Sequence, residues 1–167
     1  MERRHVEEVR TAGRSLTGYA ARFGSEARIG DFTETIAHGA FKDSLSADIL
    51  ALSDHDQTKV LARTKSGTLE LREDDMGLFY NIQVPDTQAG RDVLALAERG
   101  DLGGMSFGFT AEDENWEGRK RELRKVRLHE ISVVSAWPAY PETSVSARSK
   151  TPRRNARQMY LETLWRS

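Results

Sequence analysis

Three consecutive segments of the chain are typical of β-strands and are separated by turns of only three or four residues. Residues 59–64, 68–73 and 78–84 are rich in strand-forming side chains, and Gly67 and Gly77 lie in the intervening turns. Connections this short join antiparallel neighbours, because a parallel crossover needs a dozen residues or more. The sequence therefore predicts an antiparallel meander in a fold that is largely β.

Further elements surround this predicted meander. Tyr19, Ala21 and Phe23 alternate along a predicted strand at 16–23. A helix is predicted from Asp86 or Thr87 through residue 99, because its apolar residues share one face and Gly100 suits its C-terminal end. The remaining predictions are a short helix or turn within 32–45, strands at 105–110 and 123–134, and an exposed charged connection at 112–122 that contains the unexplained Trp116. Together these elements predict a mixed α+β domain built on a mostly antiparallel, barrel-like sheet with the helix packed outside.

The composition changes after Pro138 and Pro141, where Ser, Thr and Arg become frequent. Residues 143–155 resemble a linker, and an amphipathic helix is predicted beyond it. Its apolar side consists of Met159, Tyr160, Leu161, Leu164 and Trp165. The predicted organisation is a charged, flexible N-terminal segment (1–14), one domain (15–142), and a basic linker with a terminal helix (143–167).

The charge balance disfavours several function classes. Twenty-five basic and twenty-six acidic residues give a formal net charge of -1, so no global field favours nucleic acid or an anionic membrane. The chain has no cysteine, which excludes a disulfide framework and a cysteine nucleophile. Residues 1–10 lack the apolar stretch of a signal peptide. We expect a soluble, intracellular protein without a cofactor.

Three residue types that support nucleophilic catalysis occur along the predicted domain. Ser106 lies in a glycine-rich segment, and a serine hydroxyl becomes a useful nucleophile when a base removes its proton. His55 can act as that base near neutral pH. Glu130 can orient the imidazole and stabilise its charged form. A metal site formed by Asp54, His55 and Asp56 is disfavoured, because adjacent side chains point in different directions.

The order and spacing of these segments resemble the prohead maturation proteases of tailed bacteriophages, which are distant relatives of herpesvirus assemblin. The resemblance extends from about residue 16 to residue 143. It is carried by Thr17-Gly18-Tyr19-Ala20-Ala21-Arg22-Phe23, Gly39-Ala40-Phe41, Ser53-Asp54-His55-Asp56, Gly104-Met105-Ser106-Phe107-Gly108-Phe109, and Glu130-Ile131-Ser132-Val133-Val134 running on to Pro138. The individual motifs are weak, but their combination in this order is specific.

The resemblance implies that His55 is the general base, Ser106 the nucleophile and Glu130 the third member. Assemblin-like enzymes use a second histidine in the third role, so His129 is an alternative. Strand parity would place His129 with Ile131 and Glu130 on the other side, which does not decide between them. By analogy with assemblin, oxyanion donors are expected within 136–139.

The resemblance also implies a role and a location. We expect a serine endopeptidase that acts in the host bacterial cytoplasm, inside the assembling procapsid. Its expected partners are the major capsid protein with its scaffolding segment, and the chain itself through autoproteolysis; a homodimer is an open alternative to a monomer. No nucleic acid or membrane partner is expected. The competing hypotheses are a catalytically silent scaffold-binding factor, and a non-viral hydrolase of small esters, which would need an enclosed apolar pocket.

Overall fold

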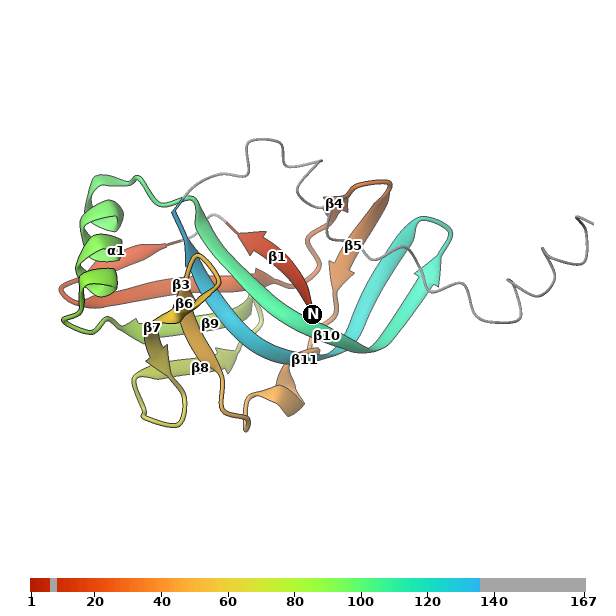
Figure 1. Cartoon of the computed structure of the whole chain (residues 1–167). Coiled ribbons are helices and arrows are strands. Elements are labelled where there is room, and N and C mark those ends of the chain that lie inside the picture. The colour runs from red at the N-terminus through yellow and green to blue at the C-terminus, as the bar shows by residue number, and fades with distance from the viewer. Residues whose placement is uncertain (7–8, 136–167) are drawn as a thin grey trace, which may run out of the picture.

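A computed structural model describes residues 1–6 and 9–135, which fold into two β-sheets with one α-helix (Figure 1). The larger sheet has seven strands, in the order β1-β10-β11-β5-β4, with β6 paired to β11 and β7 paired to β6. The smaller sheet has the order β2-β3-β9-β8. The strands are β1 Glu2–Val6, β2 Arg10–Ala12, β3 Ser15–Arg22, β4 Ala27–Ile29, β5 Phe32–Ile36, β6 Leu50–Ser53, β7 Asp56–Arg63, β8 Leu69–Glu73, β9 Gly77–Gln83, β10 Gly104–Glu117 and β11 Lys120–Val134.

A long hairpin formed by β10 and β11 lies at the centre of the larger sheet, and other strands pair with both of its sides (Figure 1). The other side of β11 pairs in parallel with β5 near its start and with β6 near its end. Between these two contacts, the Val126 amide donates to the Ala40 carbonyl, and Ser44 Oγ donates to the Val126 carbonyl at 2.6 Å. Among the described residues no strand pairs with this edge of β11 between β5 and β6, and the segment that contains the 3-10 helix Lys42–Ser44 makes the contacts there instead.

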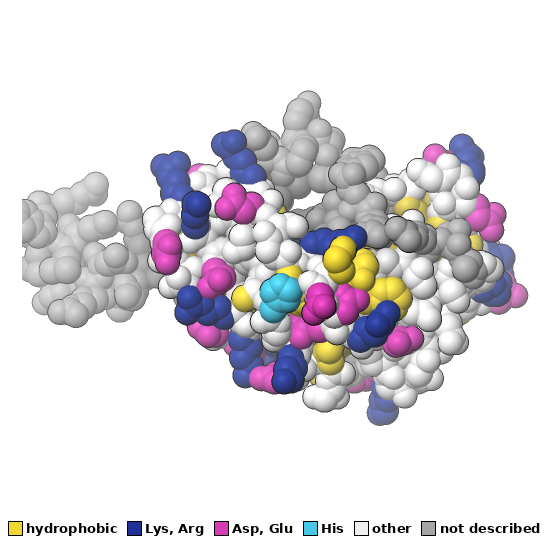
Figure 2. Space-filling view, turned by 180° about the vertical axis from the view of Figure 1, so that it is seen from behind, with side chains coloured by type: hydrophobic (Ala, Val, Ile, Leu, Met, Phe, Trp, Pro, Cys, Tyr) yellow, Lys and Arg dark blue, Asp and Glu magenta, His cyan; other side chains and the backbone are white. Residues whose placement is uncertain are grey.

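The hydrophobic core lies between the two sheets. Leu16, Tyr80 and Ile82 of the smaller sheet and Phe107 and Phe109 of the larger one are fully or almost fully buried in one cluster. Burial of this apolar surface is the main force that holds the sheets together. On the face drawn in Figure 2, acidic and basic side chains are interspersed, as the nearly balanced composition leads one to expect.

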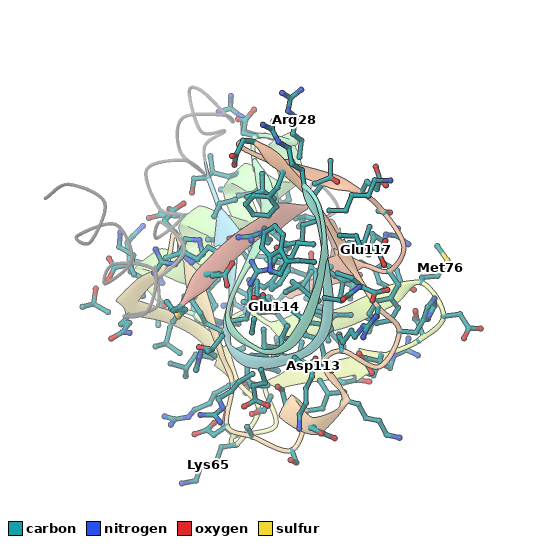
Figure 3. All side chains as sticks on the ribbon, turned by 90° about the vertical axis from the view of Figure 1, so that its right-hand side faces the viewer. Arg28, Lys65, Met76, Asp113, Glu114 and Glu117 are labelled. Carbon is teal, nitrogen blue, oxygen red and sulfur yellow. The ribbon has the colours of Figure 1, made fainter. Side chains whose placement is uncertain are left out.

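The fold is mostly β and mostly antiparallel, as the sequence predicts, but among the described residues the strands form two sheets and no closed barrel. The predicted meander is wrong in its pairing. β8 pairs with β9 in the smaller sheet, whereas β7 pairs with β6 in the larger one. The turn between β7 and β8 therefore crosses between sheets. Figure 3 shows Lys65 in this turn, and Met76 in the next, pointing away from the domain.

Two other local predictions are only partly right. The region 32–45 begins with strand β5, because Thr33, Thr35 and Ile36 are β-branched and pair with β11. The predicted short helix or turn is confirmed in the second half of the region, as the 3-10 helix Lys42–Ser44. The charged connection expected at 112–122 is strand for most of its length, since β10 and β11 stay paired as far as Glu117 and Lys120. Trp116 is explained by its edge-to-face contact with Phe32, with ring centroids 5.0 Å apart.

The helix α1, Gln88–Arg99, forms where the sequence predicts it. Thr87 caps it by accepting a hydrogen bond from the Gly90 amide at 3.2 Å. Gly100 ends it in the left-handed conformation, with φ 76°. Within the described residues no helix is long and apolar enough to span a membrane.

The segment expected to lie outside the domain contributes two strands, β1 and β2. Charges that seem to favour solvent are instead paired on β1. Glu2 contacts Arg121, and Arg4 contacts Glu34. The two partners are buried, with Arg121 6% and Glu34 2% exposed. Pairing offsets the cost of burying these charges. The expected boundary at residue 142 and the predicted tail lie outside the described residues.

Candidate active site

His55 lies in a strained two-residue turn between β6 and β7. Ser53 and Asp56 pair across the turn, and both central residues have positive φ, 50° at Asp54 and 61° at His55. Hairpin turns of type I′ need this conformation and usually use Asn-Gly. Non-glycine residues adopt it at a cost of roughly 1–3 kcal/mol, and such strain often accompanies function.

Contacts with the end of β11 hold this turn in place. The Asp54 amide donates to the Val133 carbonyl at 2.8 Å. The Asp54 carboxylate accepts hydrogen bonds from the Ser135 amide at 2.8 Å and from Ser135 Oγ at 2.9 Å. The turn that carries His55 is thereby tied to the strand that carries Glu130.

The imidazole of His55 contacts the carboxylate of Glu130, with Nδ1 and Oε1 2.7 Å apart. Both side chains are largely buried, with 12% and 6% of their surface exposed. Burial raises the pKa of Glu130, but the hydrogen bond and charge of His55, together with Ser132 and Arg3, outweigh it and leave the pKa below its ordinary value. Glu130 is thus ionised at neutral pH, so Nδ1–H of His55 donates and Nε2 stays free to accept a proton.

Ser106 lies on the same face of the sheet as Glu130. Residues opposite each other on antiparallel strands share a face, and the ladder pairs Ser106 with Ser132 and Gly108 with Glu130. The Ser132 hydroxyl donates to Glu130 Oε2 at 3.1 Å. Ser132, which lies opposite Ser106, is therefore the residue between Ser106 and the His55–Glu130 pair. Among the described residues no hydrogen bond joins Ser106 to His55. Such bonds are often long before substrate binds.

His129 is placed differently from Glu130 by a β-bulge. The ladder pairs Gly108 with Glu130 and Phe109 with Leu128, so His129 is an extra residue without a partner. Its side chain is exposed, and its Nε2 lies 2.8 Å from Thr110 Oγ1. Burial of part of the ring lowers its pKa. The expected sharing of a face with Ile131 is therefore wrong, and the residue that contacts His55 is Glu130.

The sequence analysis does not identify three further residues of the site. Ser132 holds the second oxygen of Glu130. Gly108 leaves room for Glu130, because a Cβ there would lie 2.9 Å from Glu130 Oε1. Arg3 Nε lies 3.4 Å from the same oxygen. The alternation of β11 could have suggested Ser132, but only the tertiary pairing of β1 and β10 brings Arg3 here.

An open groove of about 550 Å³ lies beside the turn that carries His55. Ser53, Asp54 and Lys59 line one side, and Asp92 and Leu96 of α1 line the other. Within residues 1–6 and 9–135, no three His, Asp or Glu side chains gather as metal ligands. The segment 136–139, expected to supply oxyanion donors, lies outside the described residues.

One of three comparisons with known proteins identifies a family for this chain. No curated protein and no solved structure matches the chain. The model of one protein family, described as caudovirus prohead serine protease, matches residues 1–157. Since this match covers most of the 167 residues, the chain belongs to the family of caudovirus prohead serine proteases.

Proposed function

We propose that the protein is a phage prohead maturation endopeptidase with Ser106 as nucleophile, His55 as general base and Glu130 as the third member. The contact between His55 Nδ1 and Glu130 Oε1, on the face that also carries Ser106, is the observation that supports these roles most strongly. The proposal includes an assemblin-like arrangement of the sheets.

The residues fit acyl transfer through an ester intermediate. Ser106 Oγ attacks the carbonyl carbon of the scissile peptide while its proton passes to His55 Nε2. Glu130 stabilises the imidazolium and keeps the ring oriented. The peptide C–N bond breaks, the amine leaves with the proton from His55, and a serine ester remains. Water then attacks this ester with His55 again as base, which releases the acid and restores Ser106.

The substrate is proposed to be the scaffolding segment of the major capsid protein, together with the chain itself. The family is described as caudovirus prohead serine proteases, and we expect removal of internal protein from the prohead to make room for DNA. We place this reaction inside the procapsid in the bacterial cytoplasm, with a homodimer as one assembly state to test. The open groove beside His55 fits a polypeptide better than a small ester, which would favour an enclosed pocket.

The proposal is tested by co-expression with the capsid protein encoded beside this chain, followed by intact-mass spectrometry of both proteins. We expect an N-terminal truncation of the capsid protein with wild type and none with Ser106→Ala or His55→Ala. His129→Ala is the matched control, since that side chain is exposed on the bulge, and should retain cleavage. Full-length capsid protein in every sample, with shells assembled, would overturn the protease assignment in favour of a silent scaffold-binding factor.

A further inference from the structure

The first strand of the chain covers the edge of the strand that carries Ser106. β1 pairs antiparallel with β10 over five residue pairs, and the register places His5 opposite Ser106 and Arg3 opposite Gly108. β1 is itself the outermost strand of the larger sheet. Since β11 pairs with the other edge of β10, both edges of the nucleophile strand are occupied at Ser106.

This arrangement matters for an enzyme that cleaves polypeptides. An extended peptide binds most simply by adding a strand to a sheet edge, where main-chain hydrogen bonds supply affinity and side-chain sites supply selectivity. The edge of β10 at Ser106 would bring a peptide backbone directly beside the nucleophile. That edge is the one that β1 occupies.

One side chain of β1 also reaches a candidate catalytic residue. Arg3 Nε lies 3.4 Å from Glu130 Oε1, the oxygen that also contacts His55. β1 thus makes the kind of contact with the site that a bound peptide would make, through a side chain on the face of the sheet that carries Glu130.

On the opposite face, β1 is held by ion pairs. Arg4 donates to both oxygens of Glu34, at 2.5 and 2.7 Å, and Glu2 accepts hydrogen bonds from Arg121. Glu34 and Arg121 also bind each other at 3.0 Å, and Arg121 contacts Glu114. The two buried charges therefore keep partners without β1, and they form one site for an acidic side chain and one for a basic side chain.

We propose that β1 occupies the position of an extended peptide substrate on β10, and that a substrate segment binds by taking its place. The segment runs antiparallel to β10, with an acidic residue toward Arg121 and a basic residue two positions later toward Glu34, as Glu2 and Arg4 are placed now. This inference rests on the proposed function, because it assumes that the peptide reacts at Ser106.

The exchange can be measured without catalysis, in full-length protein that carries Ser106→Ala. The probe is a fluorescein-labelled peptide with the sequence of residues 1–6, and a scrambled peptide serves as its control. Arg4→Ala loosens β1, whereas Arg63→Ala removes an exposed guanidinium that pairs with Asp48 far from this edge. Binding is measured by fluorescence anisotropy.

We expect Arg4→Ala to bind the probe about fivefold or more tightly than the parent, because a loosened β1 leaves the edge free for a larger fraction of the time. Arg63→Ala should bind it like the parent. Equal or weaker binding by Arg4→Ala would overturn the proposal. If Arg4→Ala does not fold, Glu2→Gln replaces it, since this change weakens the contact with Arg121 and keeps the side-chain shape.

Hydrogen exchange gives a second, independent readout. With excess probe, the amides of residues 2–6 should lose protection while those of 105–109 keep it, because one strand replaces another. Probe binding that leaves residues 2–6 protected would contradict the exchange. Reaction of Ser106 with a fluorophosphonate in the wild-type chain tests the proposed function separately. A chain that reacts but shows no strand exchange contradicts only the exchange, whereas a chain that does not react contradicts the proposed function.

Discussion

His55 and Glu130 are 75 residues apart in the chain, yet the His55 Nδ1 and Glu130 Oε1 atoms lie 2.7 Å apart. Two features produce this contact. The strained turn after β6 brings His55 to the sheet, and the regular alternation of β11 from Glu130 to Ser132 places Glu130 on the face that meets the imidazole. The contact is the basis for the predictions that follow.

Glu130→Gln should lower kcat by roughly 10²–10⁴, because an amide neither holds the imidazole tautomer nor stabilises its cation as a carboxylate does. His129→Gln is the matched change one residue away and should leave kcat close to wild type. The measurement is steady-state cleavage of purified capsid protein. A larger loss with His129→Gln than with Glu130→Gln would assign the third role to His129.

Gly108→Ala should impair catalysis by displacing Glu130. The added methyl group would meet Glu130 Cγ and Oε1 at 2.9 Å, so the carboxylate has to move away from His55. We expect a loss of kcat of about tenfold or more, since small misplacements of catalytic groups are costly. Gly67→Ala is the control: its φ of 71° makes alanine strained there, but no atom lies within 4 Å of the new methyl group. Equal kcat values for the two variants would contradict this role of Gly108.

Arg121→Met should destabilise the domain strongly. It leaves the buried Glu34 carboxylate with Arg4 as its remaining partner and removes the contact with Glu114. Loss of one member of a buried ionic network costs about 3–5 kcal/mol. Arg63→Met breaks the more exposed pair with Asp48 and should destabilise the domain far less, because solvent screens an exposed ion pair. Urea unfolding of both variants measures the difference, and similar midpoints would show that the buried network adds little.

Glu130 should make stability depend on pH in the acid range. Burial raises its pKa, but the hydrogen bond and charge of His55, together with Ser132 and Arg3, outweigh burial, so the folded-state pKa lies below the unfolded value near 4.5. The folded protein therefore binds this proton less readily than the unfolded chain. The stabilisation is present above about pH 4.5 and is lost as the pH falls through the lowered folded-state pKa.

Urea unfolding of wild type and Glu130→Gln at a series of pH values isolates this contribution from that of the other carboxylates. The difference in unfolding free energy between the two proteins should be present just above pH 4.5 and should shrink as the pH falls below it. A difference that grows on acidification would mean that the pKa of Glu130 is raised by folding.

The sequence alone determined the elements whose signals are local. The cap at Thr87 and the stop at Gly100 predicted α1 because these residues act within one helical turn. The strand at 16–23 was predicted for the same reason, from alternation within one segment. The residues His55, Ser106 and Glu130 could be proposed from their chemistry and from the family resemblance.

Only the tertiary structure decided how these elements pair. β7 and β8 are joined by a short turn, yet they belong to different sheets, because burial against the core outweighs the preference of neighbours to pair. The bulge interrupts the alternation of β11 at His129, so this side chain lies beside Thr110 and not on the face of Ile131. Arg3 reaches Glu130 because β1 pairs with β10, a hundred residues away. Such pairings depend on distant segments that meet only in the folded chain, so local sequence patterns do not contain them.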